Sequence, residues 1–353
     1  MLKRSVMLSF LFFFLILHAQ DGPYLLYYNS PDSVISVSTD LEGTVRTDTL
    51  KTPDKVKVQI PEKAEFFEAN VATVEPEKQW KFEEPEKLFA VSDIEGNYKD
   101  FITILTNNGI IDNSLNWIFG NGHLVLNGDM VDRGEFVTQC LWLVRKLEVE
   151  AEKSGGKVHY LLGNHDIMLM RGDVRYAVEK YHDLAKRTGR ELKDYFSQDT
   201  YFGNWMRSKN VIEKIGNTVF VHGGLSDSLL SYGLSIEKIN DIARKNIDVP
   251  DSLLSSQAEL IYGSFGPVWY RGLVTDNKKY DKIKKKELKK ILTHYDADRV
   301  VVGHCVVDEV SDDFKGKVIR IDVDHYEEES CGIFIEKDKV FKAMKSGKRK
   351  KLK

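Results

Sequence analysis

HLVLNGDMVDRG, residues 123–134, is the most informative stretch of the sequence. Its first half is a short and almost wholly apolar run, which is typical of a strand buried on both faces of a sheet. The run stops at Gly128 and Asp129, and Asp132 and Arg133 follow at once. Gly and Asp are also common turn residues, so the stretch alone would fit any strand that ends in a turn. The same arrangement, however, recurs along the chain.

Five other apolar runs also end abruptly in Gly, Asp, Asn or His, and they are LFAVSD, VHYLLGNHD, TVFVHGG, RVVVGH and VIRIDVD. Several of them alternate with helical patterns, such as the apolar stripe of residues 136–156, which stops at two glycines. Alternation of strand and helix predicts an α/β fold. Because open α/β sheets bind ligands beyond the carboxyl ends of their strands, we expect the polar residues at these ends to share one site.

The residues at these strand ends are carboxylates, an amide and imidazoles, and they are Asp93, Glu95, Asp129, Asp132, Asn164, His165, His222 and His304. Hard oxygen ligands together with imidazole are what divalent transition metals take in proteins. A lone histidine after a strand is more often a hydrogen-bonded core residue than a ligand. The motif HGG alone is therefore weak evidence for a metal site. The prediction of a metal centre therefore depends on the ordered set.

The ordered set GD-x-x-DRG, GNHD, HGG and GH resembles the phosphoprotein phosphatase branch of the calcineurin-like metallophosphoesterases. Three further stretches, GPVWYRG, LMRGDVRY and FGNWMRSKN, are most similar to the Shewanella-like phosphatases within that branch. The resemblance extends over residues 88–335 and not to the N-terminal part. It implies a β-sandwich flanked by helices, in four αββα layers, preceded by a small β-rich module.

The resemblance also implies a role for each residue of the set. The metal ligands would be Asp93, Glu95, Asp129, Asn164, His222 and His304. A hydroxide that bridges two metals would attack the phosphoryl group, while His165, oriented by Asp132, would protonate the departing oxygen. Arg133 and Arg271 match the arginines that hold the substrate phosphate. The implied cofactor is a pair of divalent metal ions, for which we expect manganese, with iron, zinc or magnesium as alternatives.

Glu95 departs from the family pattern, in which Asp-x-His supplies a histidine at this position. Glutamate is a competent metal ligand, and every other ligand position carries an acceptable residue type. We therefore expect an altered metal site rather than a lost one, with a preference for harder ions such as manganese or magnesium and a higher pH optimum. Asp324 and His325 in IDVDHY, where the family commonly has a glycine after IDV, are further candidates for an approach to the metals.

The expected function is hydrolysis of phosphomonoesters, with phosphorylated protein side chains as the substrate class that the resemblance suggests. Two alternatives remain open. One is a nucleotide or diadenosine-polyphosphate hydrolase with the same metal-binding motifs, and the other is a non-catalytic metal-binding relative that retains the fold. A formal net charge of only -3 gives no indication of a nucleic-acid partner.

The N-terminus has the three-part layout of a secretory signal peptide. Lys3 and Arg4 precede an apolar run at residues 7–17, which is too short to span a bilayer, and a small residue follows at Ala19. We expect an exported protein, periplasmic, surface-attached or secreted, without a membrane span in the mature chain; an uncleaved anchor is the alternative.

The remaining chain divides into three expected segments. Residues 21–85 alternate apolar and polar positions between turn residues, which predicts the β-rich module. Residues 86–340 would form the catalytic domain. Residues 341–353 form a basic block that we expect to be a solvated tail.

Overall fold

The computed structural model describes residues 21–28, 30–40, 42–276, 278–326 and 330–352. The expected signal peptide, residues 1–20, lies outside the described residues. Within them, no helix is both long enough and apolar enough to cross a membrane.

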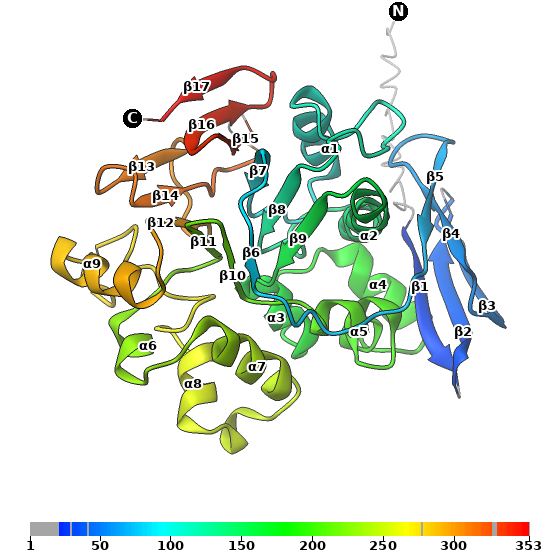
Figure 1. Cartoon of the computed structure of the whole chain (residues 1–353). Helices are drawn as coiled ribbons and strands as arrows, with labels where there is room; N and C mark the ends of the chain where they lie inside the picture. The colour runs from blue at the N-terminus through cyan, green and yellow to red at the C-terminus, as the bar shows by residue number, and fades with distance from the viewer. Residues whose placement is uncertain (1–20, 29, 41, 277, 327–329, 353) are drawn as a thin grey trace, which may run out of the picture.

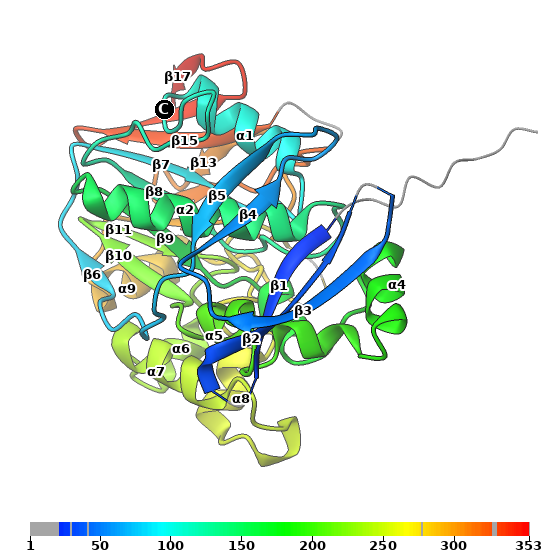
Figure 2. The same ribbon diagram turned by 90° about the vertical axis from the view of Figure 1, so that its right-hand side faces the viewer.

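The described residues between 21 and 70 form five strands, in agreement with the β-rich pattern of this region. They are β1 (Asp21–Tyr28), β2 (Ser30–Thr39), β3 (Val45–Lys51), β4 (Lys55–Gln59) and β5 (Phe66–Asn70). The first three form an antiparallel sheet in the order β1-β2-β3, and β4 pairs with β5. β1 packs against helices of the following region, as Figure 2 shows.

Two six-stranded sheets form the centre of the molecule. The first has the order β17-β16-β15-β7-β8-β9 and contains β7 (Lys87–Val91), β8 (His123–Asn127), β9 (Lys157–Leu161), β15 (Cys331–Glu336), β16 (Lys339–Met344) and β17 (Arg349–Lys351). The second has the order β13-β14-β12-β11-β10-β6 and contains β6 (Lys81–Phe82), β10 (Ile212–Ile215), β11 (Thr218–Val221), β12 (Arg299–Val302), β13 (Ser311–Asp313) and β14 (Val318–Arg320).

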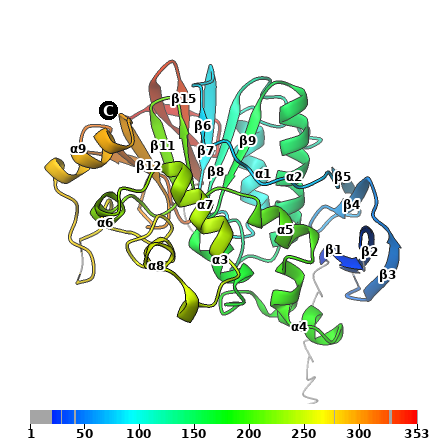
Figure 3. The ribbon, with the colours of Figure 1, turned by 60° about the horizontal axis from the view of Figure 1, so that its bottom comes forward.

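The helices complete a four-layer αββα arrangement, which confirms the predicted fold class. α1 (Tyr98–Asn107) and α2 (Val137–Lys153) cover the first sheet, whereas α6 (Asp227–Ser231), α7 (Ile236–Asn246) and α9 (Lys285–His294) lie on the side of the second (Figure 3). The other helices are α3 (Asn164–Met170), α4 (Glu179–Arg187), α5 (Tyr201–Arg207) and α8 (Ser256–Tyr262), with short 3-10 turns at Leu192–Phe196 and Asp251–Leu253.

The central strands are apolar on both faces because one face meets a helix layer and the other meets the opposite sheet. Ala90, Val125 and Leu161 of the first sheet pack with Phe220 and Val301 of the second, and all five side chains are fully buried. β7, β8 and β9 are parallel, with Val91 opposite Leu126 and Asn127 opposite Leu161. Their carboxyl ends are therefore level, as the sequence analysis required.

The basic segment at residues 341–353 differs from the solvated tail that the sequence analysis expected. It is not a solvated tail, because it contributes to β16 and to β17, which pair antiparallel at the edge of the first sheet. Val340 and Met344 pack against the core between the sheets, and the Arg349 guanidinium lies 3.3 Å from the centroid of the Phe334 ring. The apolar residues between the lysines hold the segment in the sheet.

Candidate metal and phosphate site

A pocket of about 440 Å³ opens at the carboxyl ends of the central strands. Seven of the ten site residues expected from the sequence line it, and they are Asp93, Glu95, Asp129, Arg133, His165, Arg271 and His304. The other three are buried: Asp132 contacts His165, His222 contacts Asp129, and Asn164 contacts His222. The structure therefore brings together all ten residues, which extend from residue 93 to residue 304.

Tight backbone turns position four of these side chains. Asp93 and Glu95 follow β7, Asp129 follows β8 and His304 follows β12, and all four have positive φ values, between 47° and 63°. Residues other than glycine rarely adopt this conformation, and such strain is concentrated at functional sites.

Two glycines allow the close approach of neighbouring loops. A Cβ atom at Gly128 would lie 2.5 Å from Nδ1 of His222, and one at Gly163 would lie 2.0 Å from Oδ1 of Asp129. Any larger residue at either position would push apart groups that the site holds in contact.

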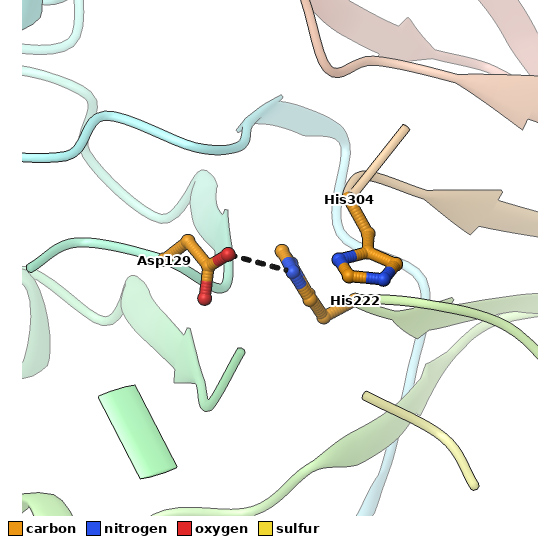
Figure 4. Close-up of side chains that lie close together, drawn as sticks. All are labelled: Asp129, His222 and His304. Atoms are coloured by element: carbon orange, nitrogen blue, oxygen red, sulfur yellow. Dashed lines mark ion pairs between the residues drawn. The ribbon is translucent and has the colours of Figure 1, made fainter. Parts of the chain in front are cut away.

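Asp129, His222 and His304 each direct a ligand atom to one small volume, and these atoms lie within 4.8 Å of one another. Figure 4 shows the carboxylate of Asp129 facing the ring of His222, with His304 beside it. His222 Nδ1 donates to the carbonyl of Asn127 at 2.9 Å, so the ring presents Nε2 to the site. This orientation by an outer carbonyl is the usual support for a metal-binding imidazole.

Nε2 of His222 lies 2.9 Å from Oδ2 of Asp129 and 3.0 Å from Oδ1 of Asn164. Either a proton on Nε2 or a cation in its place is needed where this nitrogen faces two oxygens. Burial alone would lower the pKa of His222, but the carboxylates of Asp129 and Asp93 raise it to about 10. The same negative charges would stabilise a metal ion, so these residues fit one.

His304 supplies a second observation in favour of a metal. Its Nε2 is buried and has no hydrogen-bond partner. Burial, with the nearby positive charges of His222 and Arg271, lowers the pKa of His304 to about 2, which keeps the ring neutral. A neutral, buried and unpartnered imidazole nitrogen is suited to bind a metal ion.

A second group, Glu95, Asp129 and His165, also has its ligand atoms within 4.8 Å of one another. The Glu95 carboxylate forms an ion pair with the Arg133 guanidinium. The backbone N–H of His165 donates to Oδ1 of Asp129 at 2.8 Å, whereas Oδ2 of Asp129 faces His222. Asp129 thus stands between the two groups of ligands.

His165 and Asp132 form a pair beside this cluster. Nδ1 of His165 donates to Oδ2 of Asp132 at 2.8 Å, and Nε2 lies 3.2 Å from Nη2 of Arg133. Arg271 reaches the same pocket from a separate loop, where its Nη1 donates to the carbonyl of His304 at 2.8 Å. The arrangement offers a histidine with a fixed Nδ1 proton and two guanidinium groups at one opening.

Three further residues lie at the site, although they are not among the ten expected from the sequence. Asp322 lines the pocket, and burial together with the neighbouring charge of Asp93 raises its pKa well above the usual range. Asp166 is fully buried and accepts hydrogen bonds from the backbone N–H groups of Asp129 and Gly163. The ring of Tyr176 lies 4.9 Å from that of His165.

The sequence carried a signal for each of the three. Asp322 stands in the same IDVDHY stretch as Asp324 and His325, both of which also line the pocket. Asp166 is the last residue of GNHD, and Tyr176 is the last residue of LMRGDVRY.

Comparisons with known proteins agree with this geometry. A family model described as calcineurin-like phosphoesterase matches residues 87–308. Shewanella-like protein phosphatase 2 of Arabidopsis thaliana is 29% identical over 47% of this chain and 53% of its own length. Shewanella-like protein phosphatase 1 of Plasmodium berghei is 31% identical over 62% of this chain and 60% of its own length. The chain thus covers little more than half the length of these curated relatives.

A solved structure is similar over a longer span. The cold-active protein-tyrosine phosphatase of a psychrophilic Shewanella species superimposes with a TM-score of 0.84 and 31% identity, and the match covers 95% of this chain and 99% of that one. Such coverage must include much of residues 21–85, so the resemblance extends further towards the N-terminus than residue 88, where the sequence analysis had placed its limit.

Proposed function

The chain belongs to the calcineurin-like phosphoesterases, within their Shewanella-like phosphatase branch, and we propose on this basis that it is a metal-dependent phosphatase of phosphomonoesters, with phosphotyrosine side chains as its preferred substrates. The observation that supports this most directly is the convergence of His222, Asn164 and His304 on Asp129, with the His165–Asp132 pair beside them.

We propose two divalent ions, manganese in the first place. The residues that would hold them are Asp93, Glu95, Asp129, Asn164, His222 and His304, with Asp129 between the two groups. Bound ions would lower the pKa of an attacking water and neutralise charge on the phosphoryl oxygens. Carboxylates outnumber the imidazoles in the group around Glu95, which favours a hard ion such as manganese.

His165 is the proposed general acid. For this role its Nε2 would have to carry a proton in addition to the Nδ1 proton that Asp132 holds at 2.8 Å. Transfer of that proton to the departing oxygen would avoid an alkoxide or phenolate leaving group and contribute about 10²–10⁴-fold to the rate.

Arg133 and Arg271 are the proposed phosphate ligands, since planar guanidinium groups match phosphate oxygens in pairs. Around them the pocket has an apolar rim of exposed side chains, Tyr176, Val306 and Tyr326. A phenyl ring attached to the phosphate would contact this rim, whereas a serine side chain is too short to do so. The similar Shewanella protein is a protein-tyrosine phosphatase, which agrees with that preference.

The test compares the hydrolysis of three substrates by the manganese-supplemented protein that starts at residue 21. The substrates are a phosphotyrosine peptide, the same peptide with phosphoserine, and diadenosine tetraphosphate. We expect kcat/KM to be highest for the phosphotyrosine peptide, by up to about tenfold, because an aromatic contact is worth roughly 0.5–1.5 kcal/mol. Higher kcat/KM on the dinucleotide would assign the chain to the alternative hydrolase class. No turnover of any substrate would favour a non-catalytic relative.

We also propose that the protein is exported, on the basis of the charged and apolar segments of residues 1–20. N-terminal sequencing of the protein from an extracytoplasmic fraction should give a first residue near Asp21. Recovery of the intact N-terminus in a membrane fraction would instead indicate an uncleaved anchor.

A further inference from the structure

The first residues of β1, Asp21 to Tyr24, are fixed against the catalytic sandwich. Asp21 is only 4% exposed, and its Oδ2 accepts a hydrogen bond from the hydroxyl of Tyr24 at 2.6 Å. Gly22 has a φ of 88°, and a Cβ atom there would lie 2.7 Å from the carbonyl oxygen of Val37. The indole N–H of Trp142 in α2 donates to the carbonyl of Pro23 at 2.9 Å. This segment therefore has one well-defined position.

Thr138 connects this segment to the start of α2. Its hydroxyl donates to Oδ1 of Asp21 and accepts from the backbone N–H of Gly22 at 3.3 Å. Thr138 is fully buried and lies in the first turn of α2, five residues after Arg133.

The start of α2 has no cap of its own. The first backbone N–H groups of a helix lack partners within the helix, and the N-cap residue here, Phe136, makes no side-chain hydrogen bond to them. The N–H of Val137 is instead satisfied by the hydroxyl of Tyr181 in α4, at 2.9 Å. The position at which α2 begins therefore depends on contacts with α4 and β1.

Lys180, next to Tyr181, joins the same contacts. Its Nζ lies 4.0 Å from Oδ1 of Asp21 and 4.8 to 5.2 Å from the ring centroids of Tyr181 and Phe136. The ammonium group is buried and has no hydrogen-bond partner, and among the described residues Asp21 is the only carboxylate within 4.0 Å. Because a buried charge is costly without its counter-charge, loss of the Asp21 carboxylate would leave Lys180 uncompensated.

The two helices that contact Asp21, α2 and α4, are each preceded by a loop at the pocket. The first loop carries Arg133, which lines the pocket, and the second carries Tyr176, which lies beside Arg133. The backbone N–H of Arg133 donates to the carbonyl of Tyr176 at 3.0 Å, which ties the loop before α2 to the loop before α4. The Arg133 guanidinium lies 5.5 Å from the centroid of the Tyr176 ring. We propose that Asp21 is a positioning residue for Arg133, through which the N-terminal strand sets the geometry of phosphate binding from the far side of α2.

This inference rests on the proposed role of Arg133 as a phosphate ligand. Asp21→Asn keeps the shape of the side chain but removes its charge and one acceptor. We expect KM for p-nitrophenyl phosphate and the inhibition constant of inorganic phosphate to rise about fivefold, which is the effect of one weakened hydrogen bond. The value of kcat should stay within about twofold, because a phosphate contact made equally in ground and transition state affects KM alone.

Three further variants make the result decisive. Val34 of β2 is fully buried and makes none of the contacts described above. Val34→Ala should therefore lower Tm without changing the inhibition constant of phosphate. Thr138→Val breaks the same hydrogen bonds from the α2 side and should reproduce the effect of Asp21→Asn, including in the case that Asp21→Asn does not fold. Arg133→Lys should weaken phosphate inhibition more than either.

If Asp21→Asn and Thr138→Val lower Tm as Val34→Ala does but leave phosphate inhibition unchanged, while Arg133→Lys weakens it, the positioning role is overturned and the proposed function stands. If Arg133→Lys also has no effect, the phosphate-binding role of Arg133 is overturned, and the inference falls with it.

Discussion

The Glu95 carboxylate lies beside both Arg133 and the expected metal ligands. It forms an ion pair with Arg133, and a ligand atom of its carboxylate lies within 4.8 Å of those of Asp129 and His165. The imidazole that the family has at this position offers a single nitrogen to the site and no negative charge to a guanidinium. The substitution therefore couples the expected metal site to Arg133, the proposed phosphate ligand.

This coupling predicts the effect of Glu95→His. Removal of the carboxylate should shift the affinity from manganese towards zinc, because imidazole is the softer ligand. It should also raise KM for p-nitrophenyl phosphate about threefold to tenfold, since Arg133 would lose its counter-ion. Calorimetric metal titration and steady-state kinetics measure the two effects separately. An unchanged metal preference together with an unchanged KM would show that Glu95 serves neither partner.

His165 allows a prediction that separates proton donation from binding. His165→Asn should reduce kcat by about 10²–10⁴-fold on a phosphotyrosine peptide, because the leaving phenolate would depart without a proton. The reduction should be clearly smaller on p-nitrophenyl phosphate, whose leaving group is the weaker base. Equal reductions on both substrates would contradict a general-acid role. Asp132→Asn should show the same pattern with a smaller amplitude.

At the level of elements, a chain of buried polar groups links the two sheets away from the phosphate pocket. His159 of β9 donates from Nδ1 to Oε2 of Glu213 in β10 at 2.5 Å, and its Nε2 lies 3.0 Å from Nδ1 of His123 in β8. Burial, with the adjacent His159 and Lys157, lowers the pKa of His123 to about 3. The folded state thus resists protonation of His123, whereas the unfolded chain takes up that proton near pH 6.5.

The free energy of unfolding should therefore fall as the pH drops below about 6.5, and the loss should continue towards pH 3. His123→Asn removes this contribution, so Tm should depend less steeply on pH between 6.5 and 4 than in the parent protein. Thermal unfolding at several pH values measures the slopes, with the same substitution at His182, which makes no such chain, as the control. Identical slopes in the parent and in His123→Asn would contradict the account.

The elements also show how far sequence patterns reach. The central strands and the residues at their ends were predictable because apolar runs that stop in polar residues are a local signal. β6 and β17 were not, since a strand of two or three residues is defined by its partner and not by its own pattern. A role for Asp322 was not predicted for a similar reason, because its position beside Asp93 follows from the fold and not from its own stretch of sequence.

At the scale of the whole molecule, the N-terminal strands and the sandwich share one hydrophobic core. Tyr24 and Val34 belong to the same buried cluster as Trp142 of α2 and Phe202 of α5. The ring centroids of Tyr24 and Phe202 lie 6.2 Å apart in an edge-to-face arrangement. The alternating pattern of residues 21–85 indicated strands but not their partners, because contacts between segments more than 100 residues apart leave no local trace. The N-terminal strands therefore contribute to the core that supports the sandwich.

The central claim is that residues from five strand ends, brought together by the fold, hold metal ions that are required to hydrolyse phosphate esters. The most direct test is turnover of p-nitrophenyl phosphate by the protein from residue 21, stripped of metal and then titrated separately with manganese, magnesium, iron and zinc, with Asp129→Asn as the matched control. We predict turnover that saturates near two manganese ions per chain and falls by at least about 10²-fold in Asp129→Asn. A folded parent protein that shows no turnover with any of the four metals, or the same turnover in Asp129→Asn, would contradict the claim.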